Sequence, residues 1–206
     1  MKAFLIVFLF FILTNFQIVE KREESFSNID KQQISLEQSK LIAMHSIEKF
    51  EGGYSNDKRD AGGETNRGIT LYTFMAINKQ HNFGHTKEDF YNMTDEIWRK
   101  YFDVFWDYVK ANEIENTKIR IFILDLIWNS GNKGIYILKI SLNELGHNVN
   151  MNTPITDKTV KFINECDSDV LFDKLYKKRD NLFRTCCPDF YVGLKRRIDH
   201  YKNMKI

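Results

Sequence analysis

The 206-residue chain is poor in proline, glycine and cysteine, and each shortage excludes a class of protein. Two prolines and ten glycines exclude collagen-like, proline-rich and glycine-rich chains. Three cysteines are too few for a small domain held together by disulfides. The net charge of +2 excludes a protein whose whole surface coats a polyanion. By contrast, a hydrophobic content of 43% indicates a folded chain of one domain, or one domain with a small appendage.

The longest apolar run stands at the N-terminus. Met1 and Lys2 precede an apolar segment over residues 3–13, and no charge follows until residue 20. This is the layout of a secretory signal, so we predict an exported protein, secreted or periplasmic. We expect residues 1–24 to be a signal peptide or a membrane anchor, the latter holding the chain at a membrane through residues 1–19. Both alternatives stay open, because no small-x-small cleavage site is obvious.

Export would place the cysteines in an oxidising compartment. Cys166 can then pair with Cys186 or Cys187, whereas the two adjacent cysteines rarely pair with each other. Three unpaired cysteines in the core are an equal alternative.

No cofactor and no metal site are expected. His81 and His85 are four residues apart and Glu88 is near, but ligands at that spacing need to share a helix. Asn82 and Gly84 both lie between the two histidines and indicate a loop.

Positive charge gathers at the C-terminal end, where residues 174–206 hold ten Lys or Arg and three Asp or Glu. Such a tail is usually a solvated face, but it can also meet an anionic wall polymer or anionic lipid. The basic run over residues 195–197 is too short to indicate nucleic acid, and the export signal argues against it. We expect no nucleic-acid partner.

Apolar residues recur at helical spacing along most of the chain, and no sustained period-2 run appears. We predict a mainly α fold, with short strands only in the glycine-rich loop over residues 52–70. Helices are expected near residues 35–50, after Thr94, from Asn116 or Thr117 to Gly131, over residues 135–146, and after Thr156 and Ser168. The first of these helices should bury Leu41, Met44, Ile47 and Phe50.

The glycine-rich loop begins directly after Glu51, and it holds five of the ten glycines. Gly52 and Gly53 let the chain turn sharply and expose the Glu51 carboxylate. A helix C-terminus disfavours negative charge, and the aromatic neighbours Phe50 and Tyr54 reduce hydration. Both effects raise the pKa of a carboxyl group, as a general acid near neutral pH requires. Spacing alone also allows Glu51 simply to end a helix.

Other polar residues of the loop complete a candidate site. Asp60 or Thr65 can fold back towards Glu51 and hold a water for attack, which is the division of labour in glycosidases. The remaining candidates would bind a sugar substrate through hydroxyl and acetamido groups: Tyr54, Asn56, Asn66 and Thr70. Asn56 is equally typical of a turn.

Asp125 and Asn129 lie four residues apart, on one face of a predicted helix. They can bind substrate or support the glycine-rich loop, and we favour support, because buried helices often satisfy loop backbone in this way.

Residues 51–70, EGGYSNDKRDAGGETNRGIT, resemble the signature of the glycoside hydrolase family 108 muramidases at every fixed position of its pattern. Weaker similarities follow in order over residues 124–131, 138–146 and 190–197. The resemblance covers roughly residues 35–200. It implies a lysozyme-like helical fold and cleavage of the β-1,4 bond between N-acetylmuramic acid and N-acetylglucosamine in peptidoglycan. It also implies that Glu51 is the essential acid.

The resemblance further implies a catalytic domain over residues 35–132. A C-terminal helical part over residues 133–206 is similar to a peptidoglycan-binding module and is expected to pack on the first. The chain departs from the family pattern in the stretch 152–159, which lacks both usual glycines, and at Leu194, where tryptophan is common. Trp128 replaces a small apolar residue, and can either stack on a sugar or lie in the core.

We therefore predict an exported peptidoglycan hydrolase, with Glu51 as acid and a water positioned by Asp60 and Thr65. Inversion is favoured, because no second carboxylate is clearly placed as a nucleophile. A lytic transglycosylase using the same site and a non-catalytic wall-binding or secretion-accessory protein are the alternatives. Antibacterial action is one possible role among several, which include remodelling of the producer's own wall.

Overall fold

Helices dominate the computed structural model, which describes residues 34–56 and 63–206. The segment predicted as a signal peptide or anchor and Asp60 lie outside the described residues. Residues 36–206 cluster as one compact unit. Within the described part of the chain, no helix is both long enough and apolar enough to cross a membrane.

The described elements confirm a mainly α, lysozyme-like fold. The α-helices are α2 (Leu36–Glu48), α3 (Leu71–His81), α4 (Lys87–Tyr91), α5 (Asp95–Tyr108), α6 (Thr117–Glu144), α7 (Asp157–Glu165), α8 (Ser168–Cys186) and α9 (Tyr191–Lys202). Short 3-10 turns occupy Ala111–Glu113 and Pro188–Phe190. Two strands, β1 (Thr65–Asn66) and β2 (Ile69–Thr70), form an antiparallel hairpin inside the glycine-rich loop, where short strands were expected.

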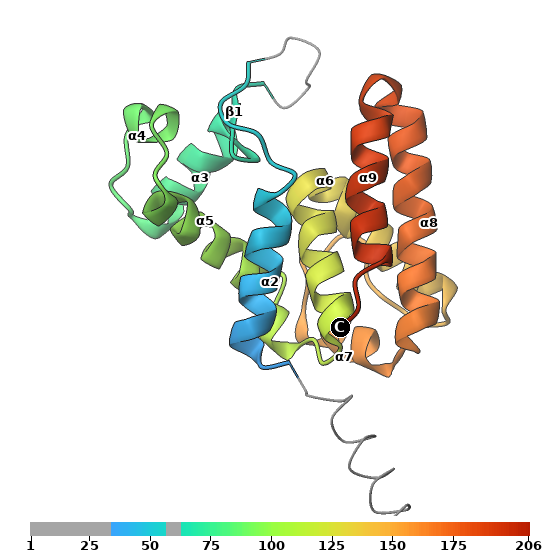
Figure 1. Ribbon diagram of the computed structural model, residues 1–206. Helices are drawn as coiled ribbons and strands as arrows, with labels where there is room; N and C mark the ends of the chain where they lie inside the picture. The colour runs from blue at the N-terminus through green and yellow to red at the C-terminus, as the bar shows by residue number, and fades with distance from the viewer. Residues whose placement is uncertain (1–33, 57–62) are drawn as a thin grey trace, which may run out of the picture. The chain divides into compact units, whose positions relative to one another are not determined.

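Helix α6 forms the centre of the core. All ten residues from 119 to 128 are buried, so this half of the helix packs on every side. Figure 1 shows α6 next to α2 and next to α8 and α9, and α6 contacts α2, α5, α7 and α8 directly. Residues near its middle are therefore close to elements that are distant in the sequence.

Several helix starts agree with the sequence prediction. The hydroxyl of Thr94 accepts a hydrogen bond from Ile97 N, and Thr156 forms a capping box at α7. Asn116, not Thr117, caps α6. At α8 the predicted Ser168 cap is wrong, because the carboxylate of Asp167 accepts from the backbone instead.

One detail of the predicted helices is confirmed and another is wrong. Gly131 interrupts the helix where its end was predicted, since its φ of 52° is not helical, and a second helical segment of α6 continues beyond this kink to Glu144. Leu41 is 48% exposed, because α2 turns Ser39, Ala43 and Ile47 towards the core instead. Helices α3 and α4 were not predicted, since the segments between residues 71 and 91 mix polar and aromatic residues without a clear stripe.

Cys166 is a free thiol, so neither of its two predicted disulfides forms. The Cys166 thiol lies 3.3 Å from His147 Nε2, in a partly buried pocket beside α7. Burial raises the pKa of this thiol, which keeps it protonated near neutral pH.

Arg120 is a charged residue on which the packing of α2 against α6 depends. Its side chain is 4% exposed and donates to the carbonyls of Ala111 and Ile114 and to the Ser39 hydroxyl. We expect Arg120→Met to lower the free energy of unfolding by about 3 kcal/mol, because hydrogen bonds to a charged donor are lost and buried carbonyls are left unpaired.

Urea denaturation measures this change. The matched control is Arg99→Met, because Arg99 is exposed on α5, and it should change stability by less than about 0.5 kcal/mol. Equal losses in the two variants would contradict the role of Arg120.

Candidate active site

Glu51 lies just beyond α2, in a turn that the backbone fixes. Its N–H donates to Ile47 O over 3.1 Å, and Gly52 and Gly53 follow without any helical hydrogen bond. The side chain is only 14% exposed. The predicted position at the end of a helix is therefore correct, and the carboxyl group points into the protein rather than into solvent.

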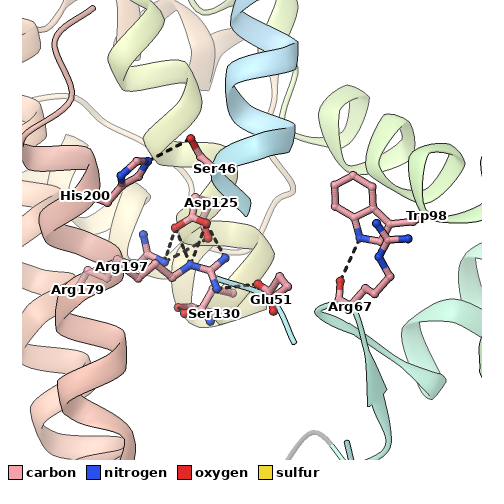
Figure 2. Close-up of polar contacts among 10 residues, drawn as sticks. Ser46, Glu51, Arg67, Trp98, Asp125, Ser130, Arg179, Arg197 and His200 are labelled. Atoms are coloured by element: carbon pink, nitrogen blue, oxygen red, sulfur yellow. Dashed lines mark hydrogen bonds and ion pairs between the residues drawn. The ribbon is translucent and has the colours of Figure 1, made fainter. Parts of the chain in front are cut away.

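The β1–β2 hairpin approaches Glu51 from one side. Arg67 and Gly68 form its two-residue turn, and both have positive φ angles, 48° and 80°. The Arg67 guanidinium contacts Glu48 at 2.9 Å and Asp95 at 2.7 Å, and it lies over the Trp98 ring. The Trp98 indole N–H donates to Arg67 O over 3.0 Å (Figure 2). These contacts fix the hairpin turn to α2 and α5.

Gly68 is in direct contact with the Glu51 carboxyl group. A Cβ atom on Gly68 would lie 2.5 Å from Glu51 Cδ, 2.7 Å from Glu51 Oε2 and 2.5 Å from Trp128 Nε1. No larger residue fits without displacing one of these groups. Trp128 is 6% exposed and packs against Trp98 and Phe105, so it lies in the core rather than open to a sugar.

A network of buried charges reaches Glu51 from the other side. Arg197 on α9 places Nη1 2.6 Å from Glu51 Oε1 and Nη2 2.6 Å from Asp125 Oδ1. Its Nε also donates to Asp125, over 3.0 Å to Oδ1 and 3.1 Å to Oδ2. Arg179 on α8 contacts Asp125 Oδ2 at 2.7 Å. Figure 2 shows Arg197 bridging the two carboxyl groups, which come from α6 and from the turn after α2.

The two carboxyl groups differ in their protonation. Burial by itself raises the pKa of Asp125, but the charges and hydrogen bonds of Arg197 and Arg179 outweigh it and lower the pKa to about 2. Burial raises the pKa of Glu51 above its ordinary value, and the positive charge of Arg197 opposes this without cancelling it. Asp125 therefore stays ionised, while Glu51 is the carboxyl group that takes up a proton first.

Three residues predicted to bind substrate make contacts within the protein. Asn66 is 5% exposed and its amide donates to the carbonyls of Phe90, over 2.7 Å, and Tyr91. Thr70 caps α3 through a hydrogen bond from Thr73 N. Asp125 is fully buried. All three side chains are engaged within the protein, and Asp125 binds two arginines rather than the glycine-rich loop that it was expected to support.

Other predicted residues remain accessible. Tyr54 is 49% exposed, and its ring meets that of Tyr91 edge to face at 5.6 Å. Asn56 is exposed and Asn129 is half-buried. The Thr65 hydroxyl donates to Gly63 O over 3.2 Å, and the residue pairs with Ser55 as well as with β2.

Sequence reasoning did not find Arg67, Arg179 or the contact of Arg197 with Glu51. Arg197 and Asp125 are separated by 72 residues, so no local spacing connects them. Arg197 was noticed only as part of the closing stretch over residues 190–197. Among the described residues, no cluster of three or more His, Cys, Asp or Glu side chains is arranged to hold a metal ion.

Comparison with known proteins agrees with this geometry. The model of the family described as Glycosyl hydrolase 108 matches residues 44–131, which include Glu51, the hairpin and Asp125. This segment of the chain is similar to glycosyl hydrolase family 108. A structure described as that of Brucella abortus SagA is similar over 81% of this chain and 95% of its own, with a TM-score of 0.63 and 20% identity. That likeness concerns the fold. No curated protein sequence matches the chain.

The match supports a glycoside hydrolase that acts on peptidoglycan. The resemblance seen in residues 51–70 is thereby confirmed at the level of the family.

The contact between Gly68 and Glu51 gives a direct test of the site. We expect Gly68→Ala to lower the free energy of unfolding by about 2 kcal/mol and glycosidase activity by about a hundredfold, since a Cβ must displace the Glu51 carboxyl and the residue has a positive φ. Thermal unfolding and a wall-lysis assay measure the two effects.

Gly53→Ala is the control for stability, because no atom lies within 4 Å of a Cβ built on Gly53 and its φ is not positive. It should leave the melting temperature close to that of the wild type. A Gly68→Ala variant with wild-type activity would show that Gly68 does not constrain the reacting carboxyl.

Proposed function

We propose that the chain is an N-acetylmuramidase that hydrolyses the β-1,4 bond between N-acetylmuramic acid and N-acetylglucosamine in peptidoglycan, with Glu51 as the general acid. The observation that carries this proposal is the environment of the Glu51 carboxyl. Arg197 holds its Oε1 at 2.6 Å, Gly68 packs against its Oε2, and burial raises its pKa.

In this mechanism Glu51 protonates the glycosidic oxygen as the bond to the muramic acid C1 breaks. The leaving sugar keeps the protonated glycosidic oxygen as a new hydroxyl group. A water adds its oxygen to C1 and releases one proton to a base, and Glu51 is reprotonated from solvent. The acid must begin each turnover with a proton, which explains why a raised pKa supports this assignment.

The Arg197–Asp125 pair serves as a positioning device. A bare guanidinium beside Glu51 would keep it ionised, but Asp125 lies in bidentate contact with the same guanidinium and offsets its charge. Because Arg197 engages Oε1, the proton is directed to Oε2, the oxygen at Gly68. Orientation and proton affinity are thus set by the same pair of residues.

Thr65 and Asp60 remain our candidates for holding the attacking water. Thr65 lies on β1, in the hairpin that contacts Glu51, and Asp60 is outside the described residues. We expect inversion, with a water rather than a carboxylate attacking C1.

Tyr54, Asn56 and Asn129 are our candidates for contact with the sugars. The half-exposed ring of Tyr54 can stack on a sugar face, and the two amides can bind hydroxyl or acetamido groups.

Export also belongs to the proposal, because a wall hydrolase must reach its polymer and the family assignment supports this. We propose that residues 1–24 direct export, by cleavage or as an anchor. The division at residue 132 into a catalytic and a C-terminal part is likewise a proposal, and α6 runs across this position.

The identity of the reaction is tested with Glu51→Gln and wild-type protein on purified peptidoglycan, with mass spectrometry of the soluble products. We expect the wild type to release fragments with reducing muramic acid ends, and the variant to lose activity by about a thousandfold, because amide nitrogen cannot supply the proton.

Anhydromuramic ends would change the reaction to a lytic transglycosylase while retaining Glu51. Full activity of Glu51→Gln would contradict its role as acid. If neither protein released products but both sedimented with the wall, the hypothesis of a non-catalytic wall-binding protein would replace that of an enzyme.

The charge network makes a second, signed prediction. Arg197→Gln removes a positive charge that lowers the Glu51 pKa, so the pH at which activity falls on the alkaline side should rise by about one unit. Asp125→Asn removes a negative charge that raises this pKa, so the same limb should move down. The measurement is kcat/KM against pH, which reports the free enzyme.

Arg197→Lys keeps the positive charge, so the alkaline limb of its pH profile should stay near the wild-type position. Circular dichroism checks folding, because breaking a buried ion pair destabilises a protein by about 3–5 kcal/mol. Shifts of the same sign in the Gln and Asn variants would refute the proposed electrostatic role.

A further inference from the structure

A groove of about 920 Å³ shares Arg197 with the mechanism above, which does not use its other lining residues. It is formed between the end of α2 and the C-terminal helix α9. Lys49 and Phe50 come from the turn that follows α2, and α9 and its flanks contribute mainly Leu194, Arg196, His200 and Met204.

The groove shares one residue with the site. Phe50 immediately precedes Glu51, and Arg197, which contacts the Glu51 carboxyl at 2.6 Å, also lines the groove. The Phe50 ring meets His200 at 5.4 Å and lies near the Arg197 guanidinium. The lining of the groove therefore begins one residue from Glu51.

Its chemistry is cationic with an apolar floor. Lys49 and Arg196 are exposed, and neither makes an ion pair with any residue that the structure describes. The acidic residue of the groove, Asp199, is already occupied by Lys195 and by the Tyr176 hydroxyl. Burial and the charge of Lys49 lower the pKa of His200, so His200 is neutral near pH 7 and adds no charge. The groove thus offers two available positive charges beside apolar surface.

We propose that this groove binds the stem peptide of peptidoglycan, with its carboxylates on Lys49 and Arg196. This inference rests on the proposed function. In peptidoglycan the peptide is attached through the lactyl group of the muramic acid, whose C1 must lie beside Glu51 for cleavage. The peptide therefore begins within a few bonds of the reacting atom, where the groove also begins. Its carboxylates match the charges of the groove, and its alanine methyl groups match the apolar floor.

The test compares three soluble tetrasaccharides with the full chain. The first carries intact stem peptides, the second has been stripped of them by an amidase, and the third carries peptides whose carboxyl groups are amidated. The readout is the ratio of kcat/KM on the intact substrate to that on the stripped one. Taking a ratio removes any effect of a charge change on Glu51 itself, because that effect is common to both substrates.

We expect the wild type to prefer the intact substrate by at least about tenfold and to treat the amidated substrate like the stripped one. The double variant Lys49→Glu/Arg196→Glu should bring the ratio close to one. The control is Lys133→Glu/Lys177→Glu, which makes the same change in net charge on α6 and α8, outside the groove. It should keep the wild-type ratio.

A wild type that cleaves intact and stripped substrates equally, or a ratio that falls equally in both double variants, would overturn the groove while leaving the muramidase in place. An amidated substrate that is cleaved like the intact one would overturn the charge pairing.

Binding of the free stem peptide separates the two hypotheses. Calorimetric titration into wild-type protein should show binding that Lys49→Glu/Arg196→Glu removes. If the wild type cleaved none of the substrates but bound the peptide in this way, the proposed reaction would fail and the groove would stand. Absence of peptide binding to the wild type would refute the groove.

Discussion

The structure depends most on the ion pair between Arg197 and Asp125. Both side chains are buried, and burying charges is unfavourable unless each is closely paired and hydrogen bonded. Asp125 meets this condition with two arginines, one from α8 and one from α9, so the packing of both C-terminal helices on α6 is tied to a single carboxylate. Arg197 then uses its remaining donor on Glu51. The buried ion pair and the carboxyl that we propose as the acid are consequently one network.

Glu51 is constrained from the opposite side by shape rather than by charge. The hairpin turn at Arg67 and Gly68 is fixed to α2 and α5, and it presses a glycine against the carboxyl. An ion pair at one oxygen fixes direction, whereas close packing at the other removes water. Together they leave the carboxyl with few orientations and little hydration, which are the two conditions that a positioned general acid requires.

Local signals predicted much of this arrangement. The glycines after residue 51 and the caps at Thr94 and Thr156 act within a few residues, so sequence spacing carries them. The contact of Arg197 with Asp125 was not predictable, because the two residues are 72 positions apart and meet only when α9 packs near α6. Asn66 shows a second limit. An amide that can bind a sugar can also satisfy loop carbonyls, and only burial, 5% exposed here, distinguishes the two uses.

The C-terminal helices contribute to the reaction site as much as to the remainder of the fold. The match to the family model ends at residue 131, before these helices, yet α9 provides both Arg197 at the Glu51 carboxyl and one wall of the groove. Removing α9 would leave Asp125 with one arginine and Glu51 with none among the described contacts. The carboxyl would then lose its orientation, and the region where the stem peptide is proposed to bind would lose one side. If both proposals hold, recognition of the polymer and control of the acid reside in the same helix.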